Sequence, residues 1–300
     1  MNRRDWLIAS AASAALPAPA CLAQAVAFER LDDQFALLTG LGGNVLVFQG
    51  STGLVLVDSG NSAGADLQSA LMQIDAAAAV DTLINTHWHP DQTTGNAQLG
   101  EAGARIVAHA KTKQYLAVGY YRPEQAGYVP PAPESAVPQQ TFYTTTSIET
   151  VGTVIDCGYL LEAHTDGDIY AHFREANLIA AGDAISPLRD PQFDWFGGGW
   201  IGGRLDALQL LLDLADDDTR FVPSFGPVVG RDYVARELAM LTTVFDRMFE
   251  FVRQGMSAQD CIEAGAMAEL DREFDDPFGF IDATHRSLWA HHNTLSHDIV

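Results

Sequence analysis

His87 and His89 are the residues of this chain whose types and spacing are best suited to chemistry. They stand one residue apart in a polar segment that directly follows a mostly apolar run, so we expect them on a loop at the end of a buried strand. Two imidazoles spaced in this way can reach one metal ion, and neutral imidazole is a preferred ligand of zinc. Asp91 follows closely enough to contact the same site or to orient a metal-bound water. Alone, the pair is a weak signal, because histidine pairs at a surface also arise by chance.

Three other histidine or aspartate residues also follow apolar runs. His164 precedes small and polar residues, Asp183 comes after an apolar run that ends in glycine, and Asp58 closes the apolar run 54–57. A single buried histidine or aspartate is more often a hydrogen-bonded structural residue than a ligand. Several strand ends that each finish in one of these residues are hard to explain in that way. Together they indicate one shared metal site.

The elements that must position these residues form two successive strand-rich blocks, each closed by helices. This order predicts an α/β fold, a four-layer αββα sandwich with two sheets face to face and helices outside. Five prolines within residues 120–140 predict a long surface loop or lid without regular structure. No linker composition separates the blocks, so residues 26–300 are expected to form one domain with a C-terminal helical extension. We expect strands at 35–38, 44–48, 53–58, 80–85, 105–108, 141–149, 160–163, 169–173 and 177–181, and helices at 63–77, up to 118, 204–216, 231–253, 257–268 and 284–296.

The ordered motifs resemble those of the metallo-β-lactamase fold superfamily over roughly residues 35–235. That superfamily carries a V-D-[ST]-G strand, then T-H-x-H-x-D-H, H-[ST]-x-G, G-D and finally G-H-G-P. The resemblance implies a first metal bound by three histidines and a second bound with the help of two aspartates, one of which bridges both ions. It also implies that the first aspartate supports the site without binding metal. The matching residues, in chain order, are Asp58, His87, His89, Asp91, His164 and Asp183.

Two positions depart from the superfamily pattern. Gln92 stands where the third clustered histidine is expected, and Phe225 replaces the histidine of G-H-G-P. An amide oxygen is a weaker ligand than imidazole for a borderline-soft ion, and a phenyl ring is no ligand. The second metal site, reduced to Asp91 and Gln92, is therefore expected to be weak, whereas the ligands of the first site are all present.

The resemblance implies a metal-dependent hydrolase, and the two replaced ligands indicate that it works with one zinc ion. Asp91 would orient or deprotonate the metal-bound water, whose hydroxide attacks the substrate. The substrate would be a small molecule with an ester, thioester, lactone or amide group. One alternative is a mono-iron sulfur or persulfide dioxygenase, in which His87, His164 and Asp183 form a facial triad. Another is a non-catalytic periplasmic binding protein. Aromatic residues expected around the pocket are Trp88, Tyr120, Tyr121, Trp195 and Trp200.

The composition restricts the partners of the protein. Formal net charge is −22, with 39 acidic against 17 basic residues and no basic stripe, so nucleic acid and anionic membranes are excluded as partners. The sequence does not indicate an oligomeric state. Two cysteines, Cys157 and Cys261, follow the N-terminal segment outside any Cys-x-x-Cys pair, and we expect both to be buried small apolar residues.

Residues 1–25 have the character of a secretory signal. A charged start, a short apolar run and an Ala-x-Ala ending at Ala25 predict export and cleavage, which leaves no membrane anchor. The pair Arg3-Arg4 before the apolar run is typical of the twin-arginine route, which carries folded bacterial proteins to the periplasm or medium. Replacing both arginines with lysine should leave the precursor in the cytoplasm, as fractionation and blotting would show. Normal periplasmic accumulation of the double variant would contradict this expectation.

Overall fold

A computed structural model describes residues 26–61, 65–75, 79–122 and 127–295; the expected signal segment lies outside these ranges. Its first sheet has seven strands in the order β1-β2-β3-β4-β5-β6-β9. Neighbours from β1 to β4 are antiparallel, and neighbours from β4 to β9 are parallel. The strands are β1 (Ala27–Arg30), β2 (Phe35–Thr39), β3 (Val45–Gln49), β4 (Leu54–Val57), β5 (Val80–Ile84), β6 (Arg105–His109) and β9 (Gln140–Phe142).

The second sheet has six strands in the order β10-β11-β12-β13-β14-β15. All neighbours are antiparallel except β13 and β14, which are parallel because helix α5 connects them. A separate hairpin joins β7 (Tyr120–Arg122) to β8 (Gly127–Val129). The strands of the second sheet are β10 (Thr145–Thr150), β11 (Thr153–Tyr159), β12 (Ile169–Phe173), β13 (Leu178–Gly182), β14 (Arg220–Pro223) and β15 (Val229–Gly230).

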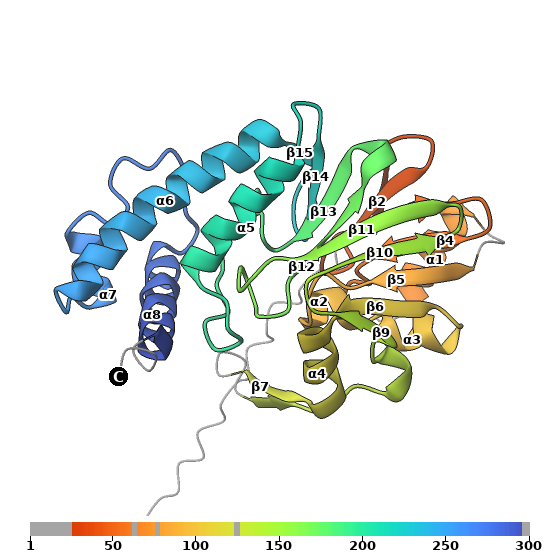
Figure 1. Cartoon of the computed structure of the whole chain (residues 1–300), viewed down its shortest axis with the longest axis horizontal. Coiled ribbons are helices and arrows are strands. Elements are labelled where there is room, and N and C mark those ends of the chain that lie inside the picture. Colours follow the sequence, from red (N-terminus) through yellow and green to blue (C-terminus); the bar gives the residue numbers. More distant parts are fainter. Residues whose placement is uncertain (1–25, 62–64, 76–78, 123–126, 296–300) are drawn as a thin grey trace, which may run out of the picture.

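The helices lie on the outer faces of the two sheets, so the fold is the expected αββα sandwich (Figure 1). One apolar core fills the space between the sheets, where Phe35, Phe48 and Phe173 pack ring to ring. A second core lies under α1 and α3, and a third joins the second sheet to α5, α6 and α8. The helices are α1 (Ala65–Ile74), α2 (Pro90–Thr93), α3 (Asn96–Glu101), α4 (Ala110–Val118), α5 (Ile201–Leu214), α6 (Arg231–Arg253), α7 (Ala258–Glu263) and α8 (Pro277–Leu295), with single 3-10 turns at η2 (Glu134–Ala136) and η3 (Arg174–Ala176).

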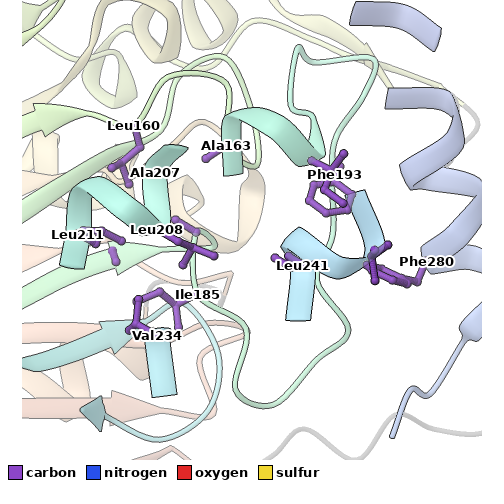
Figure 2. Close-up of a cluster of buried hydrophobic side chains, with 14 of the residues drawn as sticks. Leu160, Ala163, Ile185, Phe193, Ala207, Leu208, Leu211, Val234, Leu241 and Phe280 are labelled. Carbon is purple, nitrogen blue, oxygen red and sulfur yellow. The ribbon is translucent and has the colours of Figure 1, made fainter. Parts of the chain in front are cut away.

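The third core also fixes the loop that follows β13. Ile185 and Phe193 of that loop lie among the apolar side chains of α5 and α6, and Phe193 faces Phe280 of α8 (Figure 2). A buried ion pair crosses the same region, with Arg204 Nη2 2.8 Å from Glu237 Oε1. The C-terminal helices are therefore packed directly against the loop that leads from Asp183 towards α5.

Most predicted elements are present, and four expectations are wrong. The single strand expected at 141–149 is two strands, β9 and β10, because the chain crosses there from the first sheet to the second. The strand expected at 160–163 is a turn: Glu162 has a positive φ of 52°, and the strand is β11, which ends at Tyr159. Leu160 and Ala163 are apolar because they enter the third core from this turn. The segment 120–140 holds the β7–β8 hairpin and η2, since its described prolines fall outside both strands. Helix α8 begins at Pro277, earlier than expected, because proline suits the first turn of a helix.

Cys157 and Cys261 are both buried and unbonded, as expected of small apolar residues. Burial raises the pKa of the Cys157 thiol far above its usual range. Within the described part of the chain, no helix is both long enough and apolar enough to cross a membrane.

Candidate metal centre

Three histidines from separate parts of the fold converge on one point. His87 and His89 lie between the end of β5 and the start of α2, and His164 lies in the turn between β11 and β12. All three are buried, and one ring nitrogen from each lies within 4.8 Å of the other two. The expected first metal site is therefore assembled at the edge where strands of both sheets end.

The outward-facing nitrogens of two of these histidines have fixed partners. His89 Nε2 is 2.9 Å from Asp194 Oδ2, and His164 Nδ1 is 2.9 Å from the carbonyl oxygen of Gln192. A carboxylate and a carbonyl can only accept, so both outer nitrogens carry the ring proton. The inner nitrogens, His89 Nδ1 and His164 Nε2, are left as lone-pair donors.

His87 is oriented by a relay through Thr86 and Asp58. Asp58 accepts hydrogen bonds from Thr86 N (2.7 Å) and Thr86 Oγ1 (2.8 Å), and the same hydroxyl lies 3.2 Å from His87 Nδ1. Because the hydroxyl proton goes to Asp58, His87 Nδ1 donates to the hydroxyl oxygen and Nε2 carries the lone pair. Burial raises the pKa of Asp58 well above its usual value, against the effect of these hydrogen bonds. Asp58 thus supports a ligand without lying among the ligands.

These partners leave the inner nitrogens as a set that could bind a metal ion. His164 Nε2 and His89 Nδ1 are 3.0 Å apart, close to the roughly 3.3 Å between ligands of a tetrahedral zinc ion with Zn–N distances of about 2.0–2.1 Å. Two lone pairs that face each other in a buried site repel unless a cation lies between them. The donor set therefore fits a metal ion such as zinc or iron(II).

Asp183 lies beside the histidines. Its Oδ2 is 3.6 Å from both His87 Nε2 and His164 Nε2, and its side chain is 18% exposed. Gly182 places it there: φ is 58°, and a Cβ at this residue would lie 2.8 Å from Thr86 Oγ1. A glycine is required at position 182 because the end of β13 passes this close to the histidine loop.

The turn that carries His164 is held by Asp168. Asp168 Oδ2 accepts from the backbone N–H groups of His164 and Thr165, and Oδ1 accepts from the Thr165 hydroxyl. Burial raises the pKa of Asp168 to about 6. The loop from 195 to 200 packs over this turn, since a Cβ at Gly199 would collide with the carbonyl of His164.

Asp194 should matter to metal affinity although it lies outside the ligand set. In the Asp194→Ala variant, His89 loses the acceptor that fixes its ring and tautomer, and such losses typically weaken metal binding about 10–100-fold. Titration against a chelating dye would measure the change. The matched control is Asp213→Ala on α5, whose carboxylate contacts Gln209 instead. Equal affinity in both variants would show that His89 needs no support.

The positions expected to form the second site are arranged differently. Asp91 Oδ2 lies 3.9 Å from Arg189 Nη1, and that guanidinium lies 3.2 Å from the ring centroid of Phe225. Gln92 is fully buried, and neither of its amide atoms has a hydrogen-bond partner among the described residues. Among the described residues, this region holds a guanidinium, an amide and a phenyl ring where the superfamily pattern has two histidines.

The five aromatic residues expected around the pocket do not share one place. Trp88 is 1% exposed and packs with Tyr120 beneath the histidine loop. Tyr121 is exposed, with its ring near Phe196. Trp195 lines a cavity of about 290 Å³ that His89 and His164 also line. Trp200 lines a separate apolar cavity and stacks on His291.

Sequence reasoning missed three contributors to this region: Asp194, the Gln192 carbonyl and Arg189. All three lie in the loop after β13, for which the sequence gives no periodic pattern. The signal available was the density of polar residues and prolines in 186–194 directly after the Gly-Asp pair. That signal marks an irregular loop but assigns no partner to any side chain.

The model of the metallo-beta-lactamase superfamily matches residues 38–224, more than half of the chain. The chain therefore belongs to this superfamily, whose members are typically hydrolases. No curated protein is significantly similar to the chain in sequence.

Solved structures confirm the fold. A metallo-beta-lactamase from Pontibacter korlensis superposes with a TM-score of 0.59 at 17% identity, covering 72% of this chain and 99% of that one. The inverting sec-alkylsulfatase Pisa1 from Pseudomonas sp. gives a TM-score of 0.64 at 14% identity, covering 89% of this chain but 50% of that one. DIM-1 metallo-beta-lactamase gives 0.58 at 17% identity, covering 73% and 98%. At these identities the likeness concerns the fold alone.

Proposed function

We propose that the protein is a hydrolase that uses a single zinc ion held by His87, His89 and His164. The observation that carries this proposal is the set of three converging imidazoles whose outer nitrogens are bonded to Asp194, the Gln192 carbonyl and Thr86. Those partners prearrange three lone pairs for one cation. The second position, where Arg189 lies on Phe225, has no comparable donor set.

When bound, zinc lowers the pKa of a coordinated water to about 7 and polarises a substrate carbonyl. The residues of the chain supply the remaining functions. Asp91 would accept a proton from, or orient, the attacking water, as a general base does. The hydrogen bonds to Asp194 and Gln192 keep the imidazole rings from turning during turnover.

A small molecule with an ester, thioester, lactone or amide group is the proposed substrate. The cavity beside His89 and His164 has a volume of about 290 Å³, and Trp195 and Phe193 contribute apolar walls to it. Asp190, Asp194 and Asp276 line it as well, which disfavours polyanionic substrates there.

The proposal is tested by metal analysis of protein purified without chelators, followed by a substrate panel. We expect about one equivalent of zinc and turnover of at least one thioester, lactone, β-lactam or simple ester. Copper-loaded protein is the matched control for zinc-loaded protein, because the same site is filled by a different ion. A fully zinc-loaded protein that turns over none of these compounds would contradict hydrolysis and favour a binding protein.

One contact favours iron as a second candidate. Asp183 Oδ2 is equally distant, at 3.6 Å, from His87 Nε2 and His164 Nε2, which is the residue set of a two-histidine, one-carboxylate triad. The corresponding activity would be oxidation of a persulfide by dioxygen. Oxygen consumption by iron-loaded protein with glutathione persulfide would support this function, and its absence would eliminate it.

A further inference from the structure

Arg189 lies among the residues that stand at the second metal position of the superfamily. Its Nη1 is 3.9 Å from Asp91 Oδ2, and its guanidinium carbon is 3.2 Å from the centre of the Phe225 ring. Arg189, Phe225 and Asp183 also line one small cavity. The guanidinium therefore lies beside Asp91 and over the residue that replaces the histidine, and it shares a cavity with Asp183.

Residues of the C-terminal helical extension hold the backbone of Arg189 in place. Arg272 donates hydrogen bonds to the carbonyl oxygens of Ser186 and Arg189, and Tyr233 of α6 donates to the same Ser186 carbonyl. Leu188 packs on Gly226, whose φ of 96° and missing side chain leave room for it. The loop is thus fixed from two sides, although the Arg189 side chain itself is 47% exposed.

The ring of Phe225 is fixed as well. Asn44 Nδ2 donates to the carbonyl oxygens of Pro223 and Gly226, and the Asn44 N–H donates to the Ser224 carbonyl. These bonds tie the loop after β14 to the loop between β2 and β3. An aromatic face held in this way attracts a guanidinium through its quadrupole.

We propose that Arg189 takes the place of the second metal ion, in extension of the single-metal function proposed above. A guanidinium is always protonated, so it brings a permanent positive charge beside Asp91 and into the cavity shared with Asp183, without requiring ligands. It also repels a second cation from the same position. Arg189 and Phe225 line a groove of about 630 Å³ as well, so this charge faces any molecule that enters from that side.

Restoring the two missing histidines should therefore not restore the second metal site by itself. In the Gln92→His/Phe225→His variant, zinc content after equilibrium dialysis should stay at about one equivalent, because Arg189 still occupies the position. Adding Arg189→Ala should raise it to about two equivalents. Arg189→Gln in the same background is a second version that keeps the side-chain volume. The matched control is Arg253→Ala, since Arg253 also has a carboxylate and a phenyl neighbour, Glu250 and Phe249, on α6.

Each outcome decides the proposal. Two tightly held equivalents in the unaltered protein, or in the double-histidine variant, would overturn it, because Arg189 would then not exclude the ion. One equivalent in both triple variants, with thermal unfolding unchanged, would overturn it too. Adding His164→Ala to the triple variant should remove one of the two equivalents. That arm tests the first site separately, so a failure of the proposed function remains distinguishable from a failure of the role of Arg189.

Discussion

His164→Ala should leave the purified protein with almost no metal and should lower hydrolytic turnover by about 10³-fold or more. The inner nitrogen of His164 is 3.0 Å from that of His89 and 3.6 Å from Asp183 Oδ2. The variant therefore loses the donor atom that lies between these two groups. The change removes one of the three imidazoles that converge on this position, and catalytic zinc sites use three protein ligands. Metal content by mass spectrometry and turnover on the best substrate of the panel would measure both effects.

The matched control is His285→Ala on α8, where the ring bonds to the Met256 carbonyl. It should change neither metal content nor turnover. Asp183→Ala should weaken metal binding less than His164→Ala, because its carboxylate stands at the rim of the set. If Asp183→Ala proved the more damaging change, the triad of His87, His164 and Asp183 would be the true ligand set, and iron would become the preferred metal.

The ligand set could be predicted from sequence because each ligand is marked locally. His87 and His89 follow the mostly apolar run 80–84, and Asp183 follows the apolar run 178–181. Such runs become buried strands, and these two strands, one from each sheet, end beside each other. His164 was placed correctly even though its flanking strand was not. The strand expected at 160–163 is a turn, and the apolar residues there enter the helical core instead. An apolar run reports burial, and it does not distinguish a strand from a buried turn.

The surroundings of the ligands could not be predicted, because they depend on contacts between distant segments. His89 and Asp194 are separated by 105 residues, and nothing in either local sequence indicates the other. The same holds for Arg189: its place over Phe225 depends on Arg272 and Asn44, which lie on other elements. From sequence, the loss of two ligands suggested a second site that was merely weakened. The structure places the guanidinium of Arg189 at that site.

Asp91→Asn should lower turnover by about 10²–10⁴-fold while leaving most of the metal bound, because it removes a general base and leaves the three histidines intact. Turnover of the unaltered protein should rise with pH through an apparent pKa of about 7, the value that zinc gives to a coordinated water. Turnover of the variant should rise with pH in the same way but should be lower at every pH. Stopped assays from pH 5 to pH 9 on one substrate, with metal content measured on the same samples, would test both statements.

The matched control for this change is Asp32→Asn, since Asp32 also pairs with an arginine, Arg220, at 2.8 Å, but away from the histidines. It should leave turnover and metal content unchanged. A fall in metal content that matches the fall in turnover would identify Asp91 as a ligand, contrary to its proposed role as a base. Unchanged turnover and metal content would show that the Asp91 carboxylate is not the base. The next candidate would then be Asp183, whose Oδ2 is 3.6 Å from both His87 Nε2 and His164 Nε2.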